Sequence, residues 1–305
     1  MKILQDKNNS YDELDLKEVF NVIWSGRVLI STITFLFLMV SVVFALSLPN
    51  QYRATAIVTP VLGGGGAVSG VLGRFGGLAS LAGVGVGGAA QNEALIARHV
   101  MQSRGFIEKF IHDYDLGVKI YAASGWDKKT NTLKYDSSVY NKTDSSWIGD
   151  NAEDVVSAPS DWKLYRKFSG MFTIVDDPAN GVISVSVEHY SPHVAKELVD
   201  KLIAGINDHL KEQKLARVNL NIHYLEAQIE KTPITEMREV FYSVVEEQIK
   251  SKMLAEASPE YAFMTVSPAM IPELRSRPMR TLICAIGAFT GLLIGTVLVL
   301  FRGYF

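Results

Sequence analysis

Four histidines could in principle bind a metal or transfer protons, but their spacing does not gather a site. His189 and His193 are close in sequence, yet a proline at 192 lies between them and no third ligand stands nearby. His209 and His223 lie fourteen residues apart on one segment, without the cysteine or carboxylate partners that a zinc site needs. We therefore predict no metal site and assign these histidines to turns and surfaces.

Other catalytic patterns are equally incomplete. The carboxylate pairs at 176–177 and 246–247 are typical of a turn and of a solvated helix face, and no Gly-x-Ser-x-Gly elbow is present. A Gly-rich segment, 63–88, contains twelve of the chain's 24 glycines, but no Gly-Lys-Ser/Thr follows it to hold a phosphate and its magnesium ion. The single cysteine, Cys284, lies inside an apolar run. We predict that the chain is not an enzyme, has no catalytic residues and binds no cofactor.

One spacing does have a mechanical meaning. Gly287, Gly291 and Gly295 recur at every fourth position of a second, C-terminal apolar run. On a helix this spacing makes a groove in which another helix backbone can approach closely. We predict close packing there, either against the first apolar run or against another copy of the chain.

Two apolar runs, 28–48 and 281–301, are each long enough to cross a bilayer as a helix. A signal peptide is the alternative for the first run, but the run exceeds the usual apolar core of such peptides and follows a long, slightly acidic segment. We therefore predict a tail at 1–27, transmembrane helices at 28–48 and 281–301, a polar domain at 49–280 and a tail at 302–305. The spacing at 15–24 fits either an amphipathic surface helix or a loose tail.

The polar domain begins with a pattern of strands and helices. Residues 51–60 have the composition of a strand, and 92–116 have helical periodicity with Gly105 as a break point. The Gly-rich segment between them is either a plain mobile loop or a weakly helical element. Residues 171–190 predict a β-hairpin, in which Asn180-Gly181 supplies the positive φ angles of the turn.

A long helix from about 191 to 231 follows, with Ser191 as its N-cap and Pro192 in its first turn. Its apolar stripe changes face across a polar stretch that contains Lys211 and Lys214. We expect the lower half to pack on the hairpin sheet and the upper half on something else, such as a neighbouring subunit. Lys211 and Lys214 are our candidates for contact with a partner or a glycan.

A second helix is expected at 233–257 and a strand at 261–266. Pro268, Pro272 and Pro278 then make a stiff, extended lead into the second span, because proline interrupts helices. The predicted fold class is thus an α+β domain with a long extended helix, flanked by two transmembrane helices.

The composition argues against two features, nucleic-acid binding and disulfide bonds. The net charge of −2 gives no basic surplus for nucleic acid, and one cysteine in 305 residues leaves the polar domain without disulfides. The domain must therefore be stabilised by burial and by contacts between subunits.

The whole layout resembles the Wzz-type polysaccharide co-polymerases, the chain-length determinants of bacterial surface polysaccharides. The pattern before the C-terminal span is the most specific part of the resemblance, although Arg275 and Ser267 depart from it. The residues that carry the likeness are Asp15-Leu16, Pro49, Tyr52, Ala54, Pro60, the Gly-rich segment, Trp126-Asp127, the hairpin, Ser191-Pro192, Tyr224-Leu225-Glu226, Glu260-Tyr261-Ala262-Phe263, Pro268-Ala269, Pro272-Glu273 and Pro278.

The resemblance implies a two-pass inner-membrane protein with both ends cytoplasmic, a periplasmic domain and a ring-shaped homo-oligomer. Such a protein sets the modal length of a lipid-linked polysaccharide made by a separate, O-antigen-type polymerase. Because the sequence ends at 302–305 without a fused tyrosine kinase, we expect the lipopolysaccharide O-antigen type. The alternatives are a membrane adaptor that activates a separate tyrosine kinase in capsule or exopolysaccharide export, and a periplasmic scaffold unrelated to glycans.

Overall fold

The computed structural model describes residues 24–61, 88–148 and 158–304, and the Gly-rich segment and the N-terminal tail fall almost entirely outside these ranges. The chain divides into two compact units. Residues up to 50 and from 277 onward form one, called here the helix-pair unit, and Gln51–Ser276 form the other, called the middle unit. The predicted fold class, a mixed helix and sheet domain between two candidate membrane helices, is confirmed.

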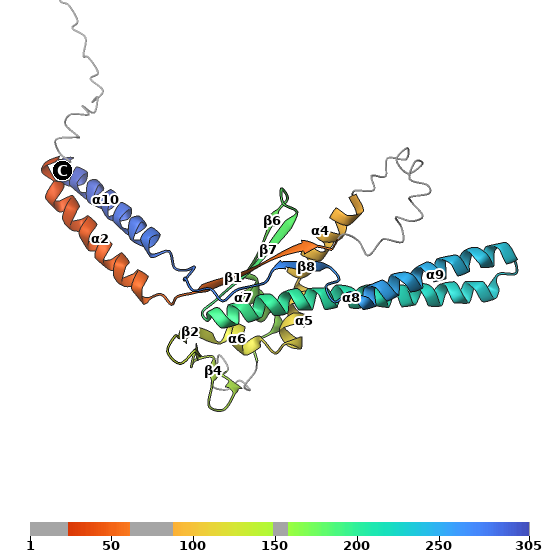
Figure 1. Ribbon diagram of the computed structural model, residues 1–305. Coiled ribbons are helices and arrows are strands. Elements are labelled where there is room, and N and C mark those ends of the chain that lie inside the picture. Colours follow the sequence, from red (N-terminus) through yellow and green to blue (C-terminus); the bar gives the residue numbers. More distant parts are fainter. Residues whose placement is uncertain (1–23, 62–87, 149–157, 305) are drawn as a thin grey trace, which may run out of the picture. The chain divides into compact units, whose positions relative to one another are not determined.

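The helix-pair unit consists of α2 (Arg27–Ser47) and α10 (Arg280–Tyr304), which lie side by side (Figure 1). At 1.5 Å per residue, the 21 residues of α2 span about 30 Å, the thickness of a bilayer core. The most apolar window of each helix has a mean hydropathy of 2.6 and 2.4, yet only 6% and 17% of these windows are buried. Such exposed apolar helices fit a lipid environment, not the core of a soluble domain.

The middle unit is built on a four-stranded antiparallel sheet with the order β6-β7-β1-β8. Its strands are β1 (Tyr52–Pro60), β6 (Phe172–Asp177), β7 (Val182–His189) and β8 (Phe263–Ser267). In β1 the small apolar side chains at 54, 56 and 58 are fully buried against the helices. On the other face Arg53 pairs with Glu188 directly opposite it, at 2.7 Å, and Thr55 hydrogen-bonds Ser186 at 2.9 Å.

The predicted hairpin is β6 and β7, but its turn differs from the expected one. Asp177 pairs with Val182, so four residues form the loop, and of Asn180 and Gly181 only Gly181 has a positive φ, +66°. The Asp177 carboxylate accepts hydrogen bonds from the backbone of Ala179 (3.2 Å) and Asn180 (3.3 Å) and from the Asn180 amide (2.7 Å). An aspartate-capped loop therefore replaces the two-residue turn that Asn-Gly suggested.

Short helices cover one face of the sheet. These are α4 (Gly88–Gln102), α5 (Arg104–Asp113), α6 (Gly117–Tyr121) and α7 (Asp161–Ser169). The break between α4 and α5 lies at Ser103 and not at Gly105, because the Ser103 side chain accepts from the Phe106 N–H at 3.3 Å and caps α5. Two small ribbons complete the unit: β2 (Ala123–Asp127) with β3 (Thr132–Tyr135), and β4 (Tyr140–Asn141) with β5 (Ser146–Trp147).

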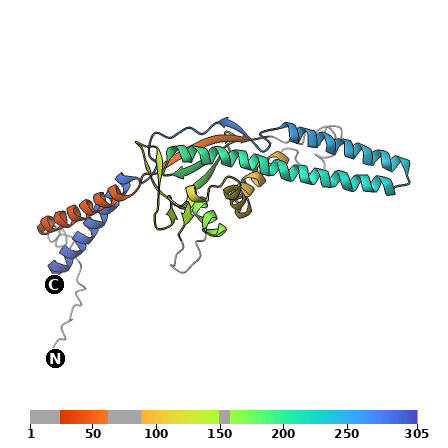
Figure 2. The ribbon, with the colours of Figure 1, turned by 90° about the horizontal axis from the view of Figure 1, so that it is seen from below.

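The long helix α8 (Pro192–Lys231) begins as predicted, with the Ser191 side chain accepting from the Val194 N–H. Its 40 residues span about 60 Å. The first half packs on β1 and β7, where Leu198, Leu202 and Ile206 are fully buried. The second half lies along α9 (Thr235–Ala257), and the two helices run side by side beyond the sheet (Figures 1 and 2).

The partner of the second stripe is therefore a segment of the same chain. Val218 and Ile229 of α8 and Ala255 of α9 are buried between the two helices. The change of face follows from the change of partner, from the sheet to α9. Our suggestion of a neighbouring subunit at this stripe was wrong in this respect.

The middle unit begins and ends at neighbouring points. The Ser276 N–H donates to the Gln51 carbonyl oxygen at 2.8 Å. Within the helix-pair unit the Arg280 guanidinium donates to Asn50 at 3.1 Å. Pro268 and Pro272 lie in the irregular segment that follows β8, and Pro278 lies just before α10, so none of the three prolines is inside a helix.

Candidate functional site

The three glycines of α10 all face α2. A Cβ atom added at Gly287 would lie 2.5 Å from the Ser41 Cβ, and one at Gly291 would lie 2.9 Å from the Thr34 Cα. One at Gly295 would lie 3.1 Å from the Ile30 Cα. The first two distances are shorter than real Cβ contacts allow, so glycine is what permits this backbone approach.

A fourth glycine, the N-cap residue of α2, extends the same contact. A Cβ atom at Gly26 would lie 2.3 Å from a methyl carbon of Val299. Gly26 has no glycine at four-residue spacing on its own segment, so the sequence pattern did not single it out. The sequence left two partners open for the glycine groove, and in this structure α2 of the same chain occupies it.

The two candidate lysines have different surroundings. The Lys211 ammonium donates to the carbonyl oxygens of Glu256 (3.1 Å) and Ser258 (3.3 Å), where it satisfies backbone groups at the end of α9. A cation is also favoured there by the helix dipole. Lys211 thus has a structural role, and reversing its charge would disturb the α8–α9 pair.

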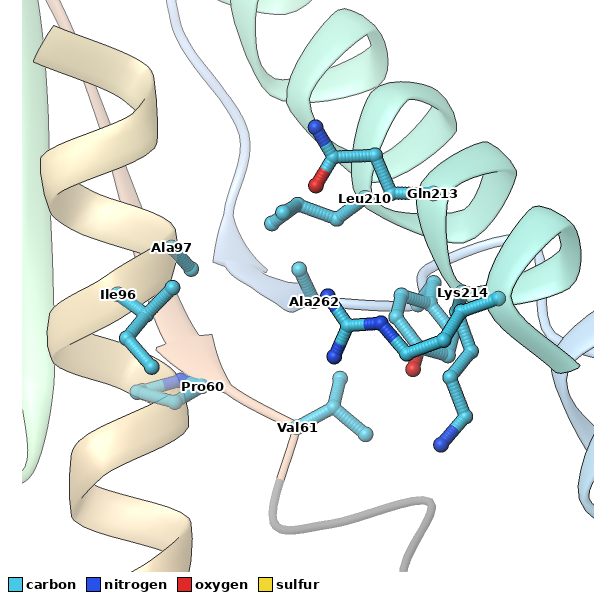
Figure 3. Close-up of a pocket in the computed structure, with 10 residues that line it drawn as sticks. Pro60, Val61, Ile96, Ala97, Leu210, Gln213, Lys214 and Ala262 are labelled. Atoms are coloured by element: carbon cyan, nitrogen blue, oxygen red, sulfur yellow. The ribbon is translucent and has the colours of Figure 1, made fainter. Parts of the chain in front are cut away.

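Lys214, in contrast, lines a pocket of about 240 Å³ where α8 faces the end of β1, α4 and the segment before β8 (Figure 3). Pro60, Val61 and Ile96 contribute apolar side chains on one side. Gln213, Lys214 and Arg217 contribute polar groups from α8. The sequence marked Lys214 but missed Arg217, because only the assembled fold shows that both line the same pocket.

His189 is the one histidine with a fixed, buried environment. It is 1% exposed. Its Nδ1 accepts from the Ser191 N–H at 3.0 Å, and its Nε2 lies 2.9 Å from the Lys119 carbonyl oxygen. Since the first partner is a donor and the second an acceptor, the ring must be neutral, with its proton on Nε2. It joins the start of α8 to α6.

No described residues form a group of three or more histidine, cysteine or acidic side chains that could hold a metal ion. His193 lies beside Trp126, with ring centroids 6.4 Å apart, and His209 contacts Phe106 at 5.4 Å. These contacts are ordinary packing. The absence of catalytic residues stays a prediction from the sequence.

The buried histidine predicts an acid-sensitive fold. Burial lowers the pKa of His189 below its ordinary value of about 6.5. As the pH falls below about 6.5 the unfolded chain takes up a proton that the folded chain cannot, so stability declines from there toward the lower folded pKa. We expect His189→Gln to flatten this decline in the unfolding midpoint between pH 7.5 and 5. His193→Gln is the control, and an equal slope in wild type and His189→Gln would contradict the assignment.

The fold and these contacts define a class of protein: a mixed α/β unit between two apolar helices, whose described residues form helix contacts and a small polar pocket. Residues 12–114 match the family model described as Wzz, chain length determinant protein. This match, which covers α2, β1, α4 and α5, confirms the resemblance to the chain-length determinant family. A search of the curated proteins found no match.

Two solved structures are similar over most of their length. One is described as a full-length bacterial polysaccharide co-polymerase, with 13% identity, coverage of 94% of this chain and 97% of that chain, and a TM-score of 0.37. The other is a fragment of WzzB, a polysaccharide co-polymerase from Salmonella Typhimurium, with 12% identity, coverage of 75% and 100%, and a TM-score of 0.27.

Proposed function

We propose that this chain is a polysaccharide co-polymerase that regulates the modal length of a bacterial surface polysaccharide, of the lipopolysaccharide O-antigen type. The observation that carries the proposal is the match of residues 12–114 to the chain length determinant model. The chain would act by binding a separate polymerase, the lipid-linked glycan, or both, and so change the odds of extension against release.

The arrangement in the membrane forms part of the proposal. We propose a two-pass inner-membrane protein with the middle unit in the periplasm and short tails in the cytoplasm. Two apolar helices support it, together with the adjacent beginning and end of the middle unit at Gln51 and Ser276. Two spans require that both tails lie on the same side.

Reporter fusions test this topology. We expect a fusion after Asn8 and a fusion after Phe305 both to report cytoplasm, and a fusion inserted at Lys142, in the loop between β4 and β5, to report periplasm. Reporters at the two ends that respond on opposite sides would contradict the two-span arrangement.

We also propose a homo-oligomeric ring. The α8–α9 pair leaves eight large apolar side chains exposed, and we take this exposed apolar surface as the place where a partner packs. These side chains are Leu220, Tyr224, Met237, Val240, Tyr242, Ile249, Met253 and Leu254, each between 44% and 69% exposed. The family resemblance implies a homo-oligomer, so we propose a second copy of the chain as the partner for this surface.

Light scattering of the full chain in detergent tests the assembly. We expect an oligomer for the wild type and a smaller species for the double variant Leu220→Asp and Val240→Asp, because buried charge opposes association. Val175→Asp, at an exposed position of β6, is the matched control and should keep the wild-type size. A monomeric wild type at micromolar concentration would contradict the ring.

Removal of the chain tests the function itself. A deletion strain should still make polymer but lose its preferred length on a gel of the lipopolysaccharide ladder. An unchanged length distribution would contradict the proposal. Lost tyrosine phosphorylation of a separate kinase, with unchanged O-antigen, would instead favour the adaptor alternative.

A further inference from the structure

The pocket lined by Lys214 and Arg217 has an uneven electrostatic character. Both cations come from α8, at positions three residues apart that share one helix face. No carboxylate stands among its described lining residues, and no ion pair joins either cation to the described part of the chain. Among the described residues, the pocket therefore presents two positive charges without an acidic partner.

The opposite wall has the complementary chemistry. Pro60 and Val61 offer apolar carbon surface there, while Leu210 and Gln213 line the pocket from α8 itself (Figure 3). A volume of about 240 Å³ is below the roughly 300–1,000 Å³ of pockets for drug-sized ligands, so a single ring fits better than a larger group. Such a site suits a small ring with an apolar face, hydroxyl groups and one negative charge.

We propose that this pocket binds a sugar unit carrying a carboxylate, a hexuronate within a polysaccharide. The choice of a saccharide rests on the proposed function, and the choice of an anionic one rests on Lys214 and Arg217. The Arg217 guanidinium can bind a carboxylate through two parallel hydrogen bonds, and Lys214 adds a point charge. The Arg217 side chain is exposed, so one unit binds weakly, and repeated units gain affinity by engaging several copies of the chain.

Saturation-transfer NMR on the full chain in detergent tests the proposal. The probes are tetragalacturonate, the neutral tetrasaccharide maltotetraose and inorganic phosphate. We expect tetragalacturonate to bind at least tenfold more tightly than maltotetraose. Arg217→Gln and Lys214→Gln should each weaken tetragalacturonate binding about tenfold, the effect of one lost charge-assisted hydrogen bond. Arg238→Gln, an exposed cation of α9, is the control and should bind like the wild type.

Any of four results would overturn the proposal for this pocket. Tetragalacturonate does not bind, the two tetrasaccharides bind equally well, or Arg238→Gln weakens tetragalacturonate binding as much as Arg217→Gln does. The fourth is displacement of tetragalacturonate by an equimolar amount of phosphate. Since Lys214 and Arg217 lie at the surface, unchanged unfolding midpoints will show that the variants fold. If tetragalacturonate does not bind while the deletion strain loses its preferred polysaccharide length, only the proposed role of the pocket is wrong. If the deletion strain keeps its lengths, the proposed function is wrong.

Discussion

Replacing Asn207 by leucine is expected to lower the free energy of unfolding of the middle unit by about 3 kcal/mol or more. Asn207 is 3% exposed. Its Oδ1 accepts from the N–H groups of Ala262 and Phe263, both at 2.8 Å, and its Nδ2 donates to the Phe263 carbonyl oxygen at 3.0 Å. Leucine leaves three backbone groups without partners, and each such group costs about 1–3 kcal/mol when buried.

The loss has a defined place in the fold, because Asn207 joins α8 to the first residue of β8, the edge strand that continues into the proline lead. Thermal unfolding of the full chain in detergent measures it, with an expected decrease of about 6–12 °C in Tm. Asn219→Leu makes the same change on the exposed side of α8 and should alter stability by less than about 0.5 kcal/mol. Equal midpoints for the two variants would show that the three hydrogen bonds contribute nothing.

Replacing Gly291 by leucine is expected to separate α2 from α10. A Cβ atom at this position already lies 2.8 Å from the Phe37 Cβ and 2.9 Å from the Thr34 Cα, and the second of these is backbone that cannot rotate away. Overpacking of this kind costs about 1–3 kcal/mol, and the remaining leucine atoms add to it. In a membrane, close backbone approach is a main source of helix association, so little else can compensate.

Unfolding in mixed micelles with a rising fraction of dodecyl sulfate, followed by circular dichroism, measures the change. We expect the order wild type, Gly291→Ala, Gly291→Leu in decreasing resistance. Ala285→Leu adds the same side chain on an exposed face of α10 and should behave like the wild type. If Gly291→Leu keeps the resistance and oligomer size of the wild type, the glycine contacts are incidental.

Local features of the middle unit could be predicted because their causes are local. The N-cap at Ser191, the hairpin and the α8 and α9 helices each depend on neighbouring residues. Asn-Gly predicts a two-residue turn, but the Asp177 carboxylate hydrogen-bonds residues 179 and 180 and stabilises a four-residue loop instead. The break between α4 and α5 likewise lies at Ser103 and not at Gly105, since a capping serine ends one helix and begins another more effectively than glycine does.

Contacts between distant segments could not be predicted in this way. The periodicity of α8 showed two apolar stripes but could not name α9 as the partner of the second. Asn207 lies within the first stripe, between Ile203 and Leu210, and a lone amide on such a face was the available signal. Its three backbone partners lie more than fifty residues away in the chain. Tyr261 and Arg217, which line the same pocket, are 44 residues apart.

The most direct test of the central claim, that the chain regulates polymer length without forming the bonds itself, is the polymer made by a deletion strain as the chain is restored from an inducible promoter. Length distribution and total saccharide are measured in the same samples. We predict that a preferred length appears with increasing amounts of the chain, while total saccharide stays about constant. Polymer that is absent before induction and rises with it would contradict the claim, because that result would identify a required enzyme or exporter.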